Sequence, residues 1–201
     1  GACKPVDVGD IEYQSKDLAS DAERFMKIGR MPEHISLINP YLLHERLPPV
    51  LAAQRDGVRI DLQLLETQLR LLQKRYFRML IEGPSGLRIP LTESETWLGL
   101  LSHWHPEVIW VSDIGEDALE GTLLSVEALQ AAGLPVKILL NNLDHQRNAE
   151  LIQYHWLVLE EELLTTVLGL IPYIGNGNKV EKTADVLAEI FDDSWLGRSR
   201  S

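Results

Sequence analysis

The feature that most constrains this chain is an alternation of short apolar runs with longer amphipathic segments. Each run is bounded by Gly, Pro, Asn or Asp, and apolar residues recur at helical spacing between the runs. A short apolar run between turn residues is typical of a strand that is buried on both faces of a parallel sheet. The pattern therefore predicts an α/β fold, a mostly parallel sheet flanked by helices. The predicted strands are an opening strand that ends at Lys4-Pro5, then 77–81, 108–111, 136–140 and 167–171.

The segments between these runs are predicted to be helices. Leucines recur at helical spacing after Asp61, which is a suitable N-cap, and Gly133 is suited to end a helix. The predicted helices are 16–27, 61–76, 119–132, 148–165 and 180–191. No repeat or linker divides the chain, so we expect a single domain over residues 1–201 with a frayed tail at about 192–201.

Charge and composition exclude several classes of protein. The formal net charge of −11 argues against a general nucleic-acid binder, which needs a cationic face. No apolar stretch reaches the length of about 18 to 20 residues that spans a membrane. Cys3 is the only cysteine, so no internal disulfide can form and a cytoplasmic location is expected. We therefore expect neither nucleic acid nor membrane as a partner.

Candidate functional residues stand at the ends of predicted strands, where open α/β sheets bind their ligands. Lys4 ends the opening strand and could neutralise a phosphate, although an exposed strand-end lysine is the simpler interpretation. Glu82 ends the next strand and precedes a turn of small residues, a place that suits a Mg²⁺ ligand. A helix-capping or solvated glutamate is the alternative interpretation.

Two more candidates depend on their context. Asp21 lies within Ser20-Asp21-Ala22, where an isolated aspartate is usually a solvated surface group. Asn142 closes the strand at 136–140, and its carboxamide offers the donor and acceptors that an adenine edge requires. A turn asparagine is the simpler interpretation of Asn142.

The order of several short motifs is more specific than any one of them. The motifs are Lys4-Pro5-Val6, Ser20-Asp21-Ala22, Asn39-Pro40-Tyr41, the Pro-rich stretch 47–53, Glu82-Gly83 followed by Pro90-Leu91, the stretches 123–129 and 132–136, and Ile171-Pro172-Tyr173. In the order of these motifs the chain resembles the dethiobiotin synthetase family over nearly all of its length.

The resemblance implies a fold and a reaction. The implied fold is a P-loop NTPase-like three-layer sandwich. The implied reaction is the Mg²⁺- and ATP-dependent closure of a ureido ring on 7,8-diaminononanoate with CO2, in a homodimer. The implied roles are Lys4 as catalytic residue, Asp21 and Glu82 as Mg²⁺ ligands, Asn142 and Pro172 as nucleotide-binding residues, and Val8, Gly83, Ser85 and Gly86 as substrate-binding residues.

The chain differs from the family most at its start. Family members open with a strand and a Gly-x-x-x-x-Gly-Lys-Thr loop that cradles phosphates, and that spacing of glycines occurs nowhere in these 201 residues. The missing strand, loop and helix form one βα unit of about 30 residues. Loss of a strand from inside a sheet would leave its neighbours unpaired. We therefore expect this unit to precede the printed residues, rather than a natural enzyme without it.

Other differences leave a second function open. The family's Gly-Ala-Gly-Gly turn is here Gly83-Pro84-Ser85-Gly86, Val8 replaces a frequent hydroxyl residue, and the segment 116–121 is longer and more acidic. These differences favour a non-catalytic domain of the same family that binds or regulates. Ser85 does not fit a nucleophile elbow because Leu87 follows Gly86. His103 and His105 have no third ligand nearby, so a loop or strand edge is favoured over a metal site there.

Overall fold

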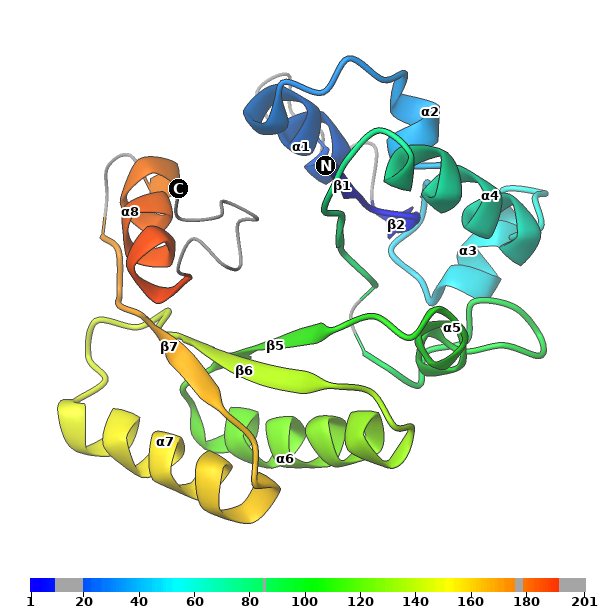
Figure 1. Cartoon of the computed structure of the whole chain (residues 1–201). Helices are drawn as coiled ribbons and strands as arrows, with labels where there is room; N and C mark the ends of the chain where they lie inside the picture. The colour runs from blue at the N-terminus through cyan, green and yellow to red at the C-terminus, as the bar shows by residue number, and fades with distance from the viewer. Residues whose placement is uncertain (10–19, 85, 176–178, 192–201) are drawn as a thin grey trace. The chain divides into compact units, whose positions relative to one another are not determined.

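The computed structural model describes residues 1–9, 20–84, 86–175 and 179–191 of the chain. The chain divides into two compact units, Gly1–Leu100 and Leu101–Ser201 (Figure 1), and each is described by itself. The expected frayed tail at 192–201 and the start of the predicted helix at 16–27 lie outside the described residues. The single domain over residues 1–201 stays a prediction.

The first unit contains two small parallel sheets. Strand β1 pairs with β4, and β2 pairs with β3, so the chain changes its partner strand between Cys3 and Val6. The elements of this unit are β1 (Ala2–Cys3), β2 (Val6–Val8), α1 (Asp21–Gly29), α2 (Ile35–Ile38), β3 (Tyr41–Leu43), α3 (Pro49–Arg55), α4 (Leu62–Gln73) and β4 (Leu80–Ile81), and helix α5 (Trp97–Trp104) crosses the boundary to the second unit.

The second unit is one parallel sheet with helices on both faces. Its elements are β5 (Val108–Asp113), α6 (Glu116–Ala131), β6 (Val136–Asn141), α7 (Ala149–Leu163), β7 (Val167–Ile171) and α8 (Lys179–Ile190). The strand order is β5-β6-β7, with α6 and α7 beneath the sheet and α8 above β7 (Figure 1). A Cβ at Gly169 would lie 2.7 Å from the Ile190 side chain, so this glycine lets α8 pack closely on β7.

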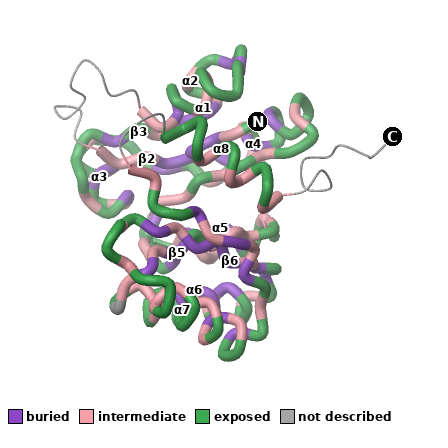
Figure 2. The backbone as a smooth tube through the Cα atoms, turned by 90° about the vertical axis from the view of Figure 1, so that its left-hand side faces the viewer, coloured by how far each residue is buried: buried purple, intermediate pink, exposed green. Residues whose placement is uncertain are grey.

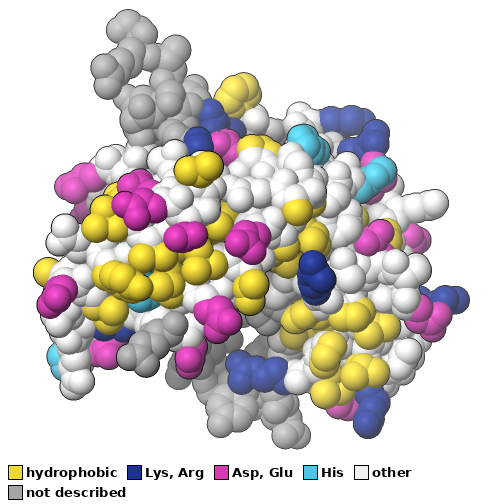
Figure 3. Space-filling view, turned by 90° about the horizontal axis from the view of Figure 1, so that it is seen from below, with side chains coloured by type: hydrophobic (Ala, Val, Ile, Leu, Met, Phe, Trp, Pro, Cys, Tyr) yellow, Lys and Arg dark blue, Asp and Glu magenta, His cyan; other side chains and the backbone are white. Residues whose placement is uncertain are grey.

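Burial follows the strands of this sheet. Ile138 and Leu140 of β6 are fully buried, and the buried residues are concentrated in the strands and on the inner sides of the helices (Figure 2). The outer face of α6 and α7 carries acidic residues with hydrophobic side chains among them (Figure 3). Leu124, Tyr154 and Leu157 are the large exposed hydrophobic residues of these two helices.

The sequence prediction of an α/β fold with parallel sheets is confirmed. Every pairing between the named strands of the described residues is parallel. Two helix caps are also confirmed. The Asp61 carboxylate accepts hydrogen bonds from Gln63 and Leu64 N–H at the start of α4, and Gly133 adopts a φ of +74° after α6. Among the described residues no helix is both long and apolar enough to cross a membrane.

Several boundaries were wrong. The strand predicted at 77–81 contains only Leu80–Ile81, because Phe77 is 88% exposed and the run is not a buried one. Helix α6 begins at Glu116 rather than at 119, and an acidic residue such as Asp117 is favourable in a first turn because of the helix dipole. His103 belongs to helix α5, not to a loop or strand edge. Five elements were not predicted, namely β2, α2, β3, α3 and α5.

Candidate active site

Lys4 lies at the point where the chain changes its partner strand. It follows β1 directly, and Cys3 pairs with Ile81 of β4, so Lys4 and Glu82 leave their strands at the same edge of the sheet. The Glu82 N–H donates to the Cys3 carbonyl at 2.9 Å, which continues the ladder by one residue. The lysine is 8% exposed, unlike an ordinary strand-end lysine on the surface.

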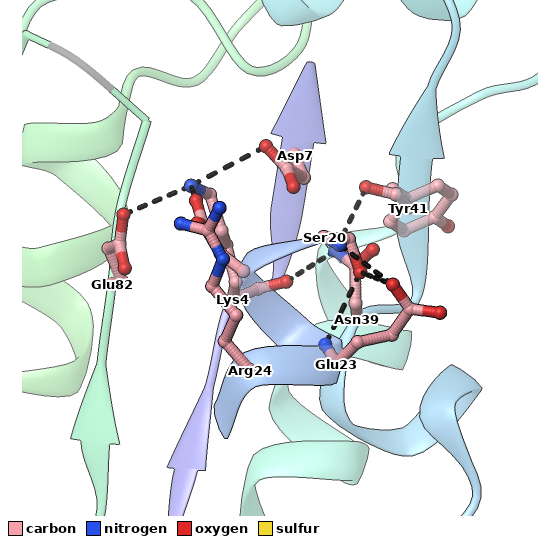
Figure 4. Close-up of polar contacts among 9 residues, drawn as sticks. Lys4, Asp7, Ser20, Glu23, Arg24, Asn39, Tyr41 and Glu82 are labelled. Atoms are coloured by element: carbon pink, nitrogen blue, oxygen red, sulfur yellow. Dashed lines mark hydrogen bonds and ion pairs between the residues drawn. The ribbon is translucent and has the colours of Figure 1, made fainter. Parts of the chain in front are cut away.

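Three carboxylates surround the Lys4 ammonium group (Figure 4). Its Nζ donates to Asp21 Oδ2, and also to Glu82 Oε1 at 3.0 Å. Asp7 Oδ1 lies 3.5 Å from the same nitrogen. Since an ammonium has three N–H donors, each can face one carboxylate. We refer to Lys4, Asp7, Asp21 and Glu82 as the Lys4 cluster.

The electrostatics of the Lys4 cluster favour a charged lysine. Burial by itself lowers the pKa of Lys4, but the hydrogen bonds to Asp21 and Glu82 outweigh it and the pKa is raised above its usual value. Arg24 Nη1 adds a second cation 3.6 Å from Asp21 Oδ1. Three carboxylates thus face two cations, and this excess of negative charge favours a further cation at the cluster.

Local structure holds the two carboxylates that were predicted as metal ligands. Asp21 is the first residue of α1, behind a capping box in which Ser20 Oγ accepts from Glu23 N–H and the Glu23 carboxylate accepts from Ser20 N–H. Glu82 precedes Gly83, where a Cβ would lie 2.2 Å from the Trp97 indole nitrogen. Gly83 therefore lets the indole ring lie directly against the turn that carries Glu82.

The donor set of the Lys4 cluster fits Mg²⁺. This ion is held in proteins by one or two carboxylates, with phosphate and water oxygens as the other ligands. Asp21 and Glu82 offer oxygens that converge on one cation, the ammonium of Lys4. Within the described residues no group of three or more His, Cys, Asp or Glu is arranged as a metal site. A metal here would therefore depend on oxygens from a ligand.

Of the residues predicted to bind substrate, only some lie next to a residue of the Lys4 cluster in the chain. Gly83 follows Glu82 directly, whereas Gly86 adopts a φ of +92°, a backbone conformation that requires glycine. Val8 is half-buried in β2 and pairs with Leu43 of β3. Ser85 lies outside the described residues. The glycines of this turn thus have structural explanations besides substrate binding.

The two residues predicted to bind nucleotide meet in the second unit. Asn142 follows β6 and Pro172 follows β7, and both line a pocket of about 220 Å³. Its remaining lining residues are Asn141, Leu143, Ile171, Tyr173, Ile174, Lys179 and Thr183. We refer to this cavity as the Asn142 pocket.

Asn142 is fixed by the strand ends and keeps part of its carboxamide for a ligand. It is 8% exposed, its N–H donates to the Ile171 carbonyl at 2.8 Å, and its Oδ1 accepts from Asp144 N–H at 3.1 Å. No described residue accepts from its Nδ2 amide, and Oδ1 has a second lone pair. A flat heterocycle with a neighbouring donor and acceptor fits this carboxamide.

An ion pair occupies the end of β5, the remaining strand of this sheet. Asp113 ends β5, and Arg147 binds both of its oxygens, with Nη2 to Oδ2 at 2.9 Å. The hydrogen bond from Arg147 lowers the pKa of Asp113. The acidic segment 116–121 forms the first turns of α6, immediately after this pair.

Four functional candidates were missed or given no role in the sequence analysis. Asp7 has a weak signal, its spacing of three residues from Lys4. Asn39 is part of a quoted motif, yet only the structure shows that its Nδ2 donates to the Lys4 carbonyl at 2.6 Å. Lys179 and Thr183 stand one helical turn apart on α8, a spacing typical of any helix face.

Comparisons with known proteins find relatives over most of the chain. A family model described as "AAA domain" matches residues 4–179. An ATP-dependent dethiobiotin synthetase of Thermodesulfovibrio yellowstonii is 27% identical over 200 residues, which are 96% of this chain and 83% of that protein. The enzyme of the same name from Rhodopseudomonas palustris is 29% identical over 193 residues, 96% of this chain and 80% of that protein. The one from Vibrio cholerae is 30% identical over 181 residues, 89% of this chain and 77% of that protein.

Proposed function

This chain belongs to the dethiobiotin synthetase family, and we propose that it carries out the ATP-dependent ring closure for which its relatives are named. The substrate would be a diamine, 7,8-diaminononanoate, with CO2 and ATP. The observation that carries the proposal is the Lys4 cluster, a buried lysine between carboxylates at a strand edge. Phosphoryl transfer depends mainly on such positioning and charge stabilisation.

The proposed reaction has three steps that balance without an oxidant or reductant. One amine of the substrate attacks CO2, forms an N–C bond and loses a proton, which gives a carbamate. A carbamate oxygen then attacks the γ-phosphorus of ATP, and ADP leaves. The second amine attacks the carbonyl carbon, forms an N–C bond and loses a proton. The C–O bond to the phosphoryl group breaks, phosphate leaves, and the ureido ring closes.

Lys4 is proposed to stabilise the anions of these steps. Its ammonium would donate to the carbamate oxygens and to the transferred phosphoryl group, and its raised pKa keeps it charged. To do so it must exchange at least one of its carboxylate partners for the ligand. Asp21 and Glu82 would hold Mg²⁺, which supplies charge neutralisation for the phosphates of ATP. Asp21 and Glu82 would then be the carboxylate partners that Lys4 gives up.

The Asn142 pocket is proposed to hold the adenine base. The Asn142 carboxamide has two N–H donors without a partner among the described residues and a lone pair, which match the edge of adenine, and Pro172 and Tyr173 supply apolar surface beside it. Val8, Gly83, Ser85 and Gly86 stay proposals for contacts with the diamine.

The proposal includes a homodimer in the cytoplasm. Support for the dimer is the exposed apolar surface of Leu124, Tyr154 and Leu157 on α6 and α7. Support for a reducing compartment is the buried, unpaired Cys3. Light scattering behind a sizing column tests the dimer, and a monomer mass at micromolar concentration would reject it.

The test of the reaction is direct. The protein that contains this chain is incubated with 7,8-diaminononanoate, bicarbonate, ATP and Mg²⁺, and dethiobiotin is measured by mass spectrometry together with released phosphate. We expect one phosphate for each dethiobiotin. Phosphate release without dethiobiotin would reject the substrate, and the absence of both would reject the enzyme.

A second candidate is a non-catalytic member of the family that binds the same ligands. The observation that favours it is that the Lys4 ammonium already pairs with three carboxylates of the chain itself. Calorimetry distinguishes the two candidates: binding of Mg-ATP without turnover supports a binding module, and turnover excludes it.

A further inference from the structure

The main chain of Lys4 lies in neither of the two sheets of the first unit. Residues before it pair with β4, and residues after Pro5 pair with β3. At this change of partner the N–H and carbonyl of Lys4 have no strand neighbour. Since the residue is 8% exposed, both groups need partners from elsewhere.

Two consecutive residues at the end of α2 supply these partners. The Lys4 N–H donates to the Ile38 carbonyl at 3.0 Å. The Asn39 Nδ2 amide donates to the Lys4 carbonyl at 2.6 Å and to the Tyr41 carbonyl of β3 at 3.3 Å (Figure 4). The orientation of the amide is determined by these bonds, because the flipped orientation would set Oδ1 against two carbonyl oxygens.

Asn39 is itself rigidly held. It is 7% exposed, and its own N–H closes α2 by donating to the Ile35 carbonyl at 2.8 Å. Its side chain therefore links three parts of the first unit: the end of α2, the start of β3 and the turn that carries Lys4. It contacts no carboxylate of the Lys4 cluster in the described hydrogen bonds.

We propose that Asn39 is a positioning residue, which aims the Lys4 side chain at the site of phosphoryl transfer by fixing the Lys4 carbonyl. Its role in catalysis rests on the proposed function, whereas its effect on Lys4 does not. The inference follows from the difference between the two kinds of contact that Lys4 makes. Its ammonium partners must exchange when a ligand arrives, but its main-chain partners need not. The anchor at Asn39 thus holds the lysine in place during the exchange.

The kinetic test uses Asn39→Ala and the milder Asn39→Ser, whose hydroxyl can still donate one hydrogen bond. We expect Asn39→Ala to lower kcat by about 10- to 100-fold, the effect of a displacement near 1 Å, with KM for ATP unchanged. Asn39→Ser should lie between this variant and the wild type. If Asn39→Ala does not fold, Asn39→Ser decides the question.

The matched control is Tyr76→Phe. Tyr76 also makes a side-chain hydrogen bond in the first unit, to the buried Glu33 at 2.6 Å, without contact to the Lys4 cluster. Its loss should lower the melting temperature and leave kcat as in the wild type. If kcat fell by the same factor in Tyr76→Phe and in Asn39→Ala, the proposal would be overturned. A general loss of rigidity in the first unit would then explain both results.

A second readout does not depend on turnover. A brief pulse of acetic anhydride at fixed pH, read by peptide mass spectrometry, measures the reactivity of Lys4 against that of Lys137 in the same chain. We expect several-fold faster labelling of Lys4 in Asn39→Ala, and no change in Tyr76→Phe. Unchanged labelling of Lys4 in Asn39→Ala would overturn the proposal. If the wild type makes no dethiobiotin, the proposed function fails and the labelling still decides the role of Asn39.

Discussion

The Lys4 cluster of the first unit and the Asn142 pocket of the second differ in what they leave for a ligand. In the cluster, the ammonium of the lysine is already paired with three carboxylates of the chain itself. In the pocket, the amide of a buried asparagine keeps its donors free among the described residues. The first region must exchange partners in order to act, whereas the second is ready to bind.

This difference divides the expected effects of substitutions. A group that exchanges partners during the reaction should influence kcat, since its contacts differ between ground and transition state. A group that binds the ligand equally well in the ground state and in the transition state should influence KM. Four substitutions test this division, and we give them from the largest expected effect to the smallest.

Lys4→Ala should have the largest effect. It removes the ammonium that is proposed to stabilise the phosphoryl group and leaves three carboxylates without their common cation. We expect kcat to fall by about 100- to 1000-fold, as for other groups that stabilise developing charge. Lys137→Ala, which removes an ion pair with Glu107, is the matched control. Undiminished turnover by Lys4→Ala would remove Lys4 from the mechanism.

Asp21→Asn and Glu82→Gln should act through Mg²⁺. Each keeps the size of the side chain and removes one negative charge from the proposed metal site. We expect the Mg²⁺ concentration for half-maximal activity to rise by at least about 10-fold. Glu66→Gln, which removes a charge from an exposed pair with Arg70, serves as the control. An unchanged Mg²⁺ dependence in both variants would place the metal elsewhere.

Asn142→Ala should raise KM for ATP by about 10-fold with little change in kcat, since one or two neutral hydrogen bonds are lost. The control is Asn148→Ala, the same change at the N-cap of α7, where Asn148 Oδ1 accepts from Leu151 N–H at 2.8 Å. It should cost about 1 kcal/mol of stability and leave KM as it was. A fall in kcat alone for Asn142→Ala would contradict the division between the two regions.

His155→Phe should change only the pH dependence of stability. His155 is 1% exposed, and burial, with a smaller effect of Arg147, lowers its pKa. The unfolded chain therefore takes up a proton first as pH falls below about 6.5, and the free energy of unfolding decreases. The slope of the free energy of unfolding against pH should approach about 1.4 kcal/mol per pH unit. It should keep this value until the pH reaches the lowered pKa of His155 in the folded protein.

Urea unfolding between pH 5 and 7 measures this slope. His155→Phe should flatten it, and His103→Gln, which changes an exposed histidine, should not. An unchanged slope in His155→Phe would mean that other groups cause the acid dependence. This measurement concerns the stability of the second unit, whereas KM for ATP reports on the Asn142 pocket.

Much of the architecture could be predicted because its signals are local. The strand at 167–171 was predicted with its observed ends, and Asp61 and Asn148 were placed at the starts of their helices. Apolar periodicity and caps depend on residues three or four positions apart, so a sequence displays them directly. Short elements such as α2 and β3 have too few residues to show a period.

What the sequence by itself determined was the alternation of parallel strands with helices, and with it the strand ends at which Lys4, Glu82 and Asn142 stand. Only the tertiary structure decided which groups meet there. The Lys4 ammonium contacts a carboxylate 78 residues away, and its carbonyl is held by an amide 35 residues away. Contacts over such distances depend on how elements pack, and packing leaves no local pattern in the chain. For that reason the lysine could be named from the sequence, but its partner Asp7 and its anchor Asn39 could not.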